Sequence, residues 1–150
     1  MASKDSAIEI VCELVKIFEG FRASPYLCPA GIATIGYGST RYINGDIVTL
    51  RDAPITKQFA EILMIHHIER ISLPSVLMLC PVEMTDGQLA ALTDFAYNLG
   101  AARLKTSTLR RYVNAGLWSD VPAQLERWVY AGNRKLKGLI ARRKAEIALL

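Results

Sequence analysis

The chain has 150 residues, of which 51% are apolar, and its 18 Lys and Arg against 14 Asp and Glu give a net charge of +4. This length is typical of one domain. No run of 18 or more apolar residues is present, which argues against a membrane-spanning helix. The first residues, Met1 to Ser6, lack the charged and then apolar pattern of a secretory signal. We therefore expect a soluble protein made in the cytoplasm, without a signal peptide and without stable membrane insertion.

The three cysteines, Cys12, Cys28 and Cys80, are an odd number and lack the spacing of metal ligands. We expect no metal and no cofactor. The basic excess suits an anionic partner, whether nucleic acid, membrane or cell-wall polymer. It is concentrated near the C-terminus, where a solvated helix face is the simplest interpretation of Arg134, Lys135, Lys137, Arg142, Arg143 and Lys144.

The N-terminal part of the chain predicts a helix followed by a small sheet. Apolar residues recur at helical spacing over residues 5–19, and Gly20 ends the helix. Glycines then separate short β-prone pieces, residues 32–37 and 46–50, and Asn44-Gly45 predicts a tight turn. We expect a small antiparallel sheet here.

The rest of the chain predicts helices, each marked by a capping residue or a helix breaker. Thr85 and Gln88 have the spacing of a capping box, Pro74 is expected to stop the helix before it, and Pro122 fits a first turn. The expected helices are residues 56–71, 85–99, 107–116, 119–132 and 137–150. This order indicates an α+β protein with a cleft where two lobes meet.

Glu19 is the first candidate catalytic residue. It lies in the last turn of the predicted N-terminal helix, at the negative end of the helix dipole, where an ionised carboxylate is disfavoured by about 0.3–1 kcal/mol. Phe18 and Phe21 flank it. Both features favour the protonated form, which a general acid working near neutral pH needs. Taken alone, Glu19 is equally well explained as a surface glutamate.

The spacing around Glu19 is more informative. The segment reads Glu19-Gly-Phe-Arg-Ala-Ser-Pro-Tyr-Leu-Cys28-Pro-Ala-Gly-Ile-Ala-Thr34-Ile-Gly-Tyr-Gly38, with eight residues between Glu19 and Cys28 and five between Cys28 and Thr34. It resembles the catalytic motif of the phage endolysins of the T4-lysozyme type, glycoside hydrolase family 24. That motif is Glu, eight residues, Asp or Cys, five residues, Thr, and then Ile-Gly-Tyr-Gly. The resemblance continues in order through residues 92–98, 107–109, 128, 131–132 and 138–146, nearly the whole chain.

The resemblance implies a lysozyme-like fold in one catalytic domain. Its sheet-containing lobe would span about residues 20–55, its connecting helix about 56–72, and its helical lobe about 75–150 together with the N-terminal helix. The implied reaction is hydrolysis of the β-1,4 bond between N-acetylmuramic acid and N-acetylglucosamine in peptidoglycan, which lyses the host cell. Glu19 would protonate the leaving oxygen, and Cys28 and Thr34, on a hairpin across the cleft, would orient or activate the attacking water, as in the inverting scheme.

Cys28 departs from the aspartate that is commoner in this motif. A neutral thiol is a weak base and supports an oxocarbenium-like transition state less well than a carboxylate does. A thiolate would serve as a base or attack the sugar directly. Whether Cys28 activates water or acts as the nucleophile therefore stays open, and with it the inverting or retaining outcome.

Four further residues are candidates for substrate binding: Tyr37, Asn98, Arg142 and Arg143. Arg142 and Arg143 match a family position where an arginine lies near the catalytic glutamate. Asn98, at the end of its predicted helix, is also explained as a cap. Tyr37 is also explained as an ordinary strand residue.

Three rival functions fit parts of the sequence. A cysteine peptidase that uses Cys28 with His66 or His67 leaves the spacing of Glu19 and Thr34 unexplained. A basic nucleic-acid-binding module lacks a recognisable reading motif, so we expect no nucleic-acid partner. The main alternative is a lytic transglycosylase, which shares the peptidoglycan substrate but releases 1,6-anhydro products.

The expected partner is bacterial peptidoglycan. The resemblance also implies dependence on a holin-type membrane protein, which would release the enzyme from the host bacterial cytoplasm to the cell wall. We expect the enzyme to act as a monomer.

Overall fold

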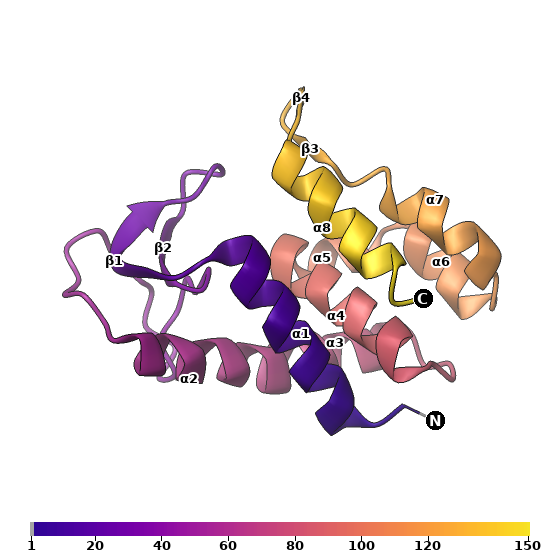
Figure 1. Ribbon diagram of the computed structural model, residues 1–150, viewed down its shortest axis with the longest axis horizontal. Coiled ribbons are helices and arrows are strands. Elements are labelled where there is room, and N and C mark those ends of the chain that lie inside the picture. Colours follow the sequence, from indigo (N-terminus) through magenta and orange to yellow (C-terminus); the bar gives the residue numbers. More distant parts are fainter. Residues whose placement is uncertain (1) are drawn as a thin grey trace.

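The computed structural model describes residues 2–150 (Figure 1). Its elements in the first half are α1 (Lys4–Glu19), β1 (Arg22–Leu27), β2 (Ala33–Gly36), α2 (Lys57–His67), a π-helical turn η1 (Ile68–Ser72) and α3 (Leu73–Leu79). The second half contains α4 (Asp86–Leu99), α5 (Ala101–Lys105), α6 (Thr108–Asn114), a 3₁₀ turn η2 (Trp118–Asp120), α7 (Val121–Leu125), β3 (Tyr130–Ala131), β4 (Arg134–Lys135) and α8 (Lys137–Ile147). The predicted α+β class with a small antiparallel sheet is confirmed.

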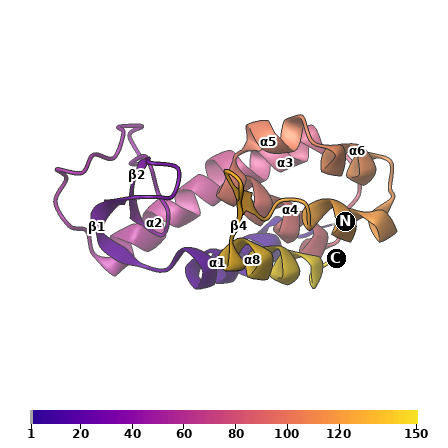
Figure 2. The same cartoon turned by 90° about the horizontal axis from the view of Figure 1, so that it is seen from above.

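The long helix formed by α2, η1 and α3 connects the two ends of the molecule (Figures 1 and 2). The strands β1 and β2 lie at its N-terminal end, and helices α4 to α8 lie towards its other end. The N-terminal helix α1 packs mainly against α4, with Ala7, Val11 and Val15 fully buried. The end of α1 lies near the middle of the molecule, and the chain continues from there into β1 (Figure 1).

The sheet differs in part from the prediction. Strand β1 pairs with β2 in antiparallel register, with Tyr26 opposite Thr34. Residues 46–50 form no strand and contribute only an isolated bridge between Ile47 and Arg41. The predicted turn is confirmed, since the Gly45 N–H donates to the Tyr42 carbonyl at 3.0 Å and Gly45 has a φ of +92°.

Pro74 does not stop the helix, contrary to the prediction. It lies in the first turn of α3, directly after the π-helical turn. In that turn the Leu73 N–H donates to the Ile68 carbonyl, five residues back. The wider π turn accommodates the pyrrolidine ring, which would clash with a preceding carbonyl in a regular α-helix. The helix therefore continues from Lys57 to Leu79.

Among residues 2–150, this helix is the one that is long and apolar enough, by length and composition alone, to cross a membrane. It also belongs to the protein core, where Ala60, Met64 and Ile68 are fully buried. A core helix of a folded protein passes the same test of length and composition.

Two apolar clusters hold the elements together. The larger one joins the long helix to α1, α4, α6 and α7, and Phe95 of α4 is among its fully buried members. The smaller one consists of Ile35, Val48 and Leu63, and it fixes the strands on α2. Gly36 lies so close to α2 that a Cβ atom there would lie 3.0 Å from the Cβ of Ala60.

The helical half agrees with the prediction at its caps. Thr85 and Gln88 form the expected capping box of α4, and Ser107 caps α6. Helix α5 was not expected. The predicted helix over 119–132 ends at Leu125, because the chain then turns into the short β3–β4 hairpin.

The expected solvated basic face at the C-terminus is only partly present. Lys137 and Lys144 of α8 are exposed, as are Arg134 and Lys135 in the β3–β4 hairpin. Arg142 and Arg143 are instead buried, with exposed fractions of 3% and 1%. Both arginines have buried carboxylate partners, which removes them from the basic surface.

Candidate active site

Glu19 is the last residue of α1, and the helix ends because Gly20 adopts a φ of +67°. Strand β1 begins three residues later, at Arg22, and the Glu19 side chain contacts Arg142 of α8 and lies against Gly38 in the segment after β2. Its side chain is 21% exposed. A carboxylate placed in this way is both held by the protein and accessible to a ligand.

Gly38, directly after β2, packs against the Glu19 carboxyl group. A Cβ atom at this position would lie 2.8 Å from Glu19 Oε2 and 2.9 Å from Glu19 Cδ. Gly38 also has a φ of +84°, which side-chain-bearing residues rarely adopt. The second glycine of the Ile-Gly-Tyr-Gly segment is therefore required by both contact and backbone conformation.

Arg142 of α8 contacts the same carboxyl group. Its Nη1 donates to Glu19 Oε1 at 2.7 Å, while its Nε and Nη2 donate to the two oxygens of Asp94 at 2.9 and 2.8 Å. Burial lowers the pKa of Arg142, but the hydrogen bonds and charges of Asp94 and Glu19 outweigh burial and raise this pKa above its usual value. Arg142 is thus a permanent cation beside Glu19.

The surroundings of Glu19 combine two expectations: apolar neighbours next to it in the sequence, and the arginine that the family resemblance implied, which is Arg142. Phe18 does lie close, but its ring faces the Arg142 guanidinium at 5.8 Å. Phe21 is turned towards the Tyr37 ring, 5.7 Å away. Because the Arg142 guanidinium lies at hydrogen-bond distance from the Glu19 carboxyl group, the immediate environment of this group is charged as well as apolar.

Arg143 forms a second buried pair beside the first. Its Nη2 donates to Asn98 Oδ1 at 2.7 Å and to Glu146 Oε1 at 3.0 Å. Burial lowers the pKa of Arg143 and raises the pKa of Glu146 well above its usual value. The structure therefore brings Asn98 and Arg143 together, and it places Arg142 rather than Arg143 on Glu19.

Cys28 and Thr34 lie on one face of the β1–β2 hairpin. Thr34 is opposite Tyr26, and Cys28 continues this face by two residues, its N–H donating to the Ile32 carbonyl at 3.0 Å. The Thr34 hydroxyl donates to the Ile32 carbonyl at 2.9 Å and is almost completely buried. Cys28 is half-buried and forms no disulfide.

The Tyr37 ring is 3% exposed and belongs to the larger apolar cluster. The Tyr37 carbonyl accepts a hydrogen bond of 2.6 Å from the Tyr97 hydroxyl. Burial and the charge of Glu19 raise the pKa of Tyr97 above its usual value. The structure thus shows Tyr37 as a packing residue. A contact of its ring with sugar stays a prediction.

The remaining histidine candidates lie at the end of α2. His67 packs edge-to-face on the Tyr97 ring, with ring centroids 5.1 Å apart, and burial lowers its pKa. No hydrogen bond joins it to Cys28 among the bonds of the described residues. Residues 2–150 also contain no group of three or more His, Cys, Asp or Glu placed to hold a metal ion.

Sequence reasoning missed Asp94, the partner of Arg142. Asp94 is fully buried in α4, within a run of eight consecutive buried residues from Leu89 to Ala96. An acidic residue surrounded on both sides by apolar helix positions is itself a signal, because buried carboxylates are rare unless they are paired. The identity of its partner could not be read from this signal.

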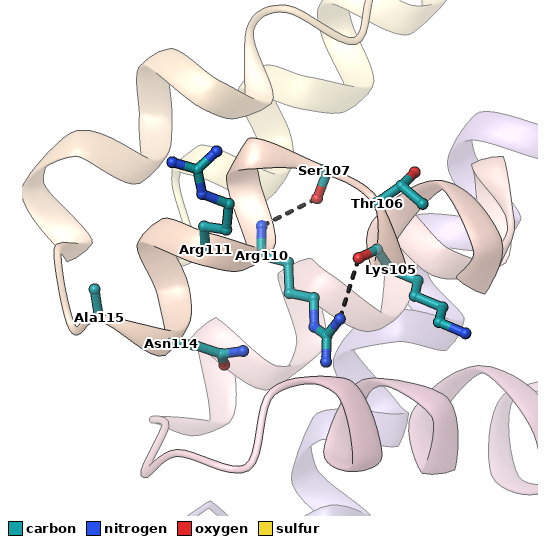
Figure 3. A pocket seen from close by; sticks show the side chains of 7 residues that line it. All are labelled: Lys105, Thr106, Ser107, Arg110, Arg111, Asn114 and Ala115. Atoms are coloured by element: carbon teal, nitrogen blue, oxygen red, sulfur yellow. Dashed lines mark hydrogen bonds between the residues drawn. The ribbon is translucent and has the colours of Figure 1, made fainter.

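The surface hollow at the α5–α6 connection does not include Glu19. Figure 3 shows this hollow of about 430 Å³, where Arg110 Nη1 donates to the Lys105 carbonyl at 3.1 Å. Its lining is Lys105, Thr106, Ser107, Arg110, Arg111, Asn114 and Ala115. The contacts of Glu19, rather than the depth of a hollow, identify the candidate site.

Comparisons with known proteins identify the family of the chain. The family profile described as Phage lysozyme matches residues 16–146. An endolysin of Acyrthosiphon pisum secondary endosymbiont phage 1 is 36% identical over 143 residues, which are 91% of this chain and 91% of that protein. A SAR-endolysin of Bacteriophage PS119 is 34% identical over 129 residues, which are 85% of this chain and 73% of that protein.

A solved structure shares the fold. The endolysin from Escherichia coli O157:H7 phage FAHEc1 superposes with a TM-score of 0.80 at 29% identity, covering 93% of this chain and 89% of that chain. This likeness confirms the predicted lysozyme-like fold. With a family match over most of its length, the chain belongs to the phage lysozyme family.

Proposed function

We propose that the chain is an endolysin of glycoside hydrolase family 24, which hydrolyses the β-1,4 bond between N-acetylmuramic acid and N-acetylglucosamine in peptidoglycan. The observation that carries the proposal is the position of the Glu19 carboxyl group, partly exposed between Gly38 and Arg142. The phage lysozyme family and the endolysin relatives support this substrate.

Glu19 acts as the general acid. Its Oε1 accepts a hydrogen bond from Arg142, so the proton that is delivered to the glycosidic oxygen belongs on Oε2, beside Gly38. Proton donation to the leaving oxygen is the step that a glycosidase acid must supply. Arg142 fixes the orientation of the carboxyl group for that transfer.

Cys28 and Thr34 serve the attacking water. The Thr34 hydroxyl donates its hydrogen bond to the Ile32 carbonyl. The lone pairs of the hydroxyl oxygen are therefore free to accept a hydrogen bond from a water molecule. Cys28 lies on the same face of the hairpin, where a thiol or thiolate activates that water. In the alternative role, the Cys28 thiolate attacks the sugar and forms a covalent intermediate that water then hydrolyses.

The remaining candidates differ in what they offer to a sugar. The Asn98 amide oxygen is occupied by Arg143, so its amide N–H groups are what it presents to substrate. Arg142 supports catalysis by holding Glu19, and Arg143 by holding Asn98. Tyr37 supports the site by packing on Phe21 near the end of α1.

Mass spectrometry of digested peptidoglycan tests the proposal. Purified cell walls are treated with the protein, and the soluble fragments are analysed before and after borohydride reduction. We expect disaccharide-peptide fragments with reducing N-acetylmuramic acid ends. Products with 1,6-anhydro ends would instead establish a lytic transglycosylase, and free peptides with uncut glycan strands would establish a peptidase that uses Cys28.

We further propose that the enzyme is a monomer, and that a holin-type protein lets it pass from the host cytoplasm to the wall. Several relatives are named SAR-endolysins, which makes secretion the alternative route. Expression in a bacterial host with and without a holin, followed by culture turbidity, separates the two routes. Lysis that is abrupt and holin-dependent supports the first; gradual lysis without a holin contradicts it.

A further inference from the structure

Asp94 occupies an unusual place, in the middle of a helix and fully buried. Both of its oxygens accept hydrogen bonds from Arg142, through Nε at 2.9 Å and Nη2 at 2.8 Å. A bidentate pair fixes the plane of a guanidinium group as well as its position. The one remaining nitrogen of that plane, Nη1, then points at Glu19 Oε1, 2.7 Å away.

The charges in this cluster matter for a general acid. Glu19 must carry a proton to act, whereas a cation at hydrogen-bond distance favours its ionised form. Among residues 2–150, Arg142 has two carboxylates within 4.0 Å, those of Glu19 and Asp94. Asp94 is therefore the group that offsets the positive charge of Arg142 when Glu19 is protonated.

The neighbouring groups do not replace Asp94 in this role. The titratable and charged side chains that interact with Glu19 or Arg142 include Tyr26 on β1, Asp94 and Tyr97 on α4, and Arg143 and Glu146 on α8. Tyr26 also interacts with Cys28 and carries the Arg22 guanidinium over its ring at 4.1 Å. Burial and the charge of Glu19 raise the pKa of both tyrosines, which keeps them neutral. Burial, and then a hydrogen bond with Asp94, raise the pKa of Glu146 well above its usual value, and its ion-pair partner is Arg143 rather than Arg142.

Resting on the proposed function, we infer that Asp94 is a positioning residue for the general acid: it orients Arg142 towards Glu19 and offsets the charge of Arg142 beside the Glu19 carboxyl group. A purely structural role, in which Asp94 only joins α4 to α8, would affect stability and the overall rate. It would not affect the pH at which activity is lost.

The test is the pH dependence of kcat/KM for Asp94→Asn on purified peptidoglycan. Without the Asp94 charge, Arg142 favours the ionised form of Glu19, so the alkaline limb of the profile should move to lower pH by about one unit. Asp52→Asn is the control, because it removes an acid that is bonded to Tyr42 and Thr49 rather than to Arg142, and it should leave the limb in place. An Asp94→Asn profile with the parent's shape and only a lower rate would overturn the inference.

A double variant decides the matter if Asp94→Asn does not fold. Replacing Arg142 by Gln and Asp94 by Asn together removes both buried charges and leaves neither unpaired. Because the cation is also gone, the alkaline limb of this variant should lie at or above that of the parent. A limb below that of the parent would overturn the inference, since no charge on Arg142 would remain to explain it.

Glu19→Gln, measured in parallel, separates this inference from the proposed function. Activity in Glu19→Gln would remove Glu19 as the acid and the proposed mechanism with it. An inactive Glu19→Gln together with an unshifted Asp94→Asn profile would leave the mechanism standing and overturn only the role of Asp94.

Discussion

The two sides of the candidate site are built in different ways. On the acid side, Glu19, Asp94 and Arg142 lie on three different helices and are joined by hydrogen bonds of 2.7 to 2.9 Å. On the hairpin side, Cys28 follows the end of β1, and its backbone bonds, to the Ile32 carbonyl and from the Gly31 N–H, stay within its own turn. Glu19 is held by contacts with residues far away in the chain, whereas Cys28 is held by contacts within its own turn.

This difference indicates which side tolerates chemical change. A buried ion pair leaves an uncompensated charge when one partner is replaced, so each residue on the acid side depends on the others. A side chain on a half-exposed hairpin turn can be exchanged without disturbing the core. Cysteine in place of the aspartate of related motifs is therefore found on the side of the site where the fold permits it.

Replacement of the acid itself should have the largest effect. Glu19→Gln keeps the shape of the side chain but cannot donate a proton to the leaving oxygen, so lysis should fall by about 100- to 10,000-fold. Turbidity loss of a peptidoglycan suspension measures the rate, and circular dichroism checks the fold. Near-parental lysis by a normally folded variant would remove Glu19 as the acid.

Breaking the ion pair on the acid side should have the next largest effect. Arg142→Leu leaves Asp94 buried without a partner and should lower the free energy of unfolding by about 3–5 kcal/mol, as measured by urea denaturation. Replacing Arg142 and Asp94 together by leucine should recover much of this loss. A single variant as stable as the parent would show that the pair does not hold α4 and α8 together.

Gly38→Ala should disturb the acid from the hairpin side. The new Cβ would lie 2.8 Å from Glu19 Oε2, and displacement of a catalytic group by about 1 Å can reduce the rate about 100-fold. Gly45→Ala is the control, since Gly45 also has a positive φ, +92°, but nothing lies within 4 Å of the added Cβ. Both variants should lose similar stability. Equal loss of activity in both would mean that contact with Glu19 is unimportant.

Substitution of Cys28 should have a smaller effect, because the hairpin side is the adaptable one. Cys28→Ala should lower the rate by roughly 10-fold, less than the ~100-fold expected of a full acid–base group. Cys28→Asp should retain or gain activity. Cys12→Ala, on α1, serves as the control for general thiol effects. Wild-type rates in Cys28→Ala would show that another group holds the water.

The weakest predicted effect concerns the exposed charges outside the site. Neutralising Lys135, Lys137 and Lys144 together should lower the rate on cells and flatten its salt dependence, because exposed charges are screened over about 8–10 Å at physiological ionic strength. Cleavage of a short uncharged chitin-type oligosaccharide should change little. An unchanged salt profile on cells would mean that these lysines serve only solubility.

The sequence predicted what depends on local pattern. The end of α1 at Glu19, the capping box at Thr85 and the cap at Ser107 each follow from a few adjacent residues, and each is confirmed. The β3–β4 hairpin was missed because strands of two residues have no period to detect. For the site, spacing and resemblance selected Glu19, Cys28 and Thr34, whose catalytic roles stay predictions.

What the sequence did not predict depends on long-range contacts. The apolar neighbours of Glu19, Phe18 and Phe21, were predicted from adjacent positions, whereas an arginine near Glu19 was expected only through the family resemblance, and Arg142 lies 123 positions away in the chain. Asp94 in turn lies 48 positions from Arg142. Ion pairs between distant helices leave no local pattern, and they determine the charge around the acid.

The π-helical turn before Pro74 has a consequence for the phase of the long helix. Relative to an α-helix, a π turn inserts one extra residue, and each residue rotates the helix by about 100°. The wider turn absorbs this residue, so α3 keeps the rotational position that it would have in an α-helix without the extra residue. Deleting one residue within Ile68–Ser72 should therefore leave Val76 and Leu79 facing the core. Inserting one residue within α2, where no wider turn absorbs it, would instead rotate the helix beyond it by about 100°. The π turn thus lets the long helix contain one more residue without changing which side of α3 meets the protein interior.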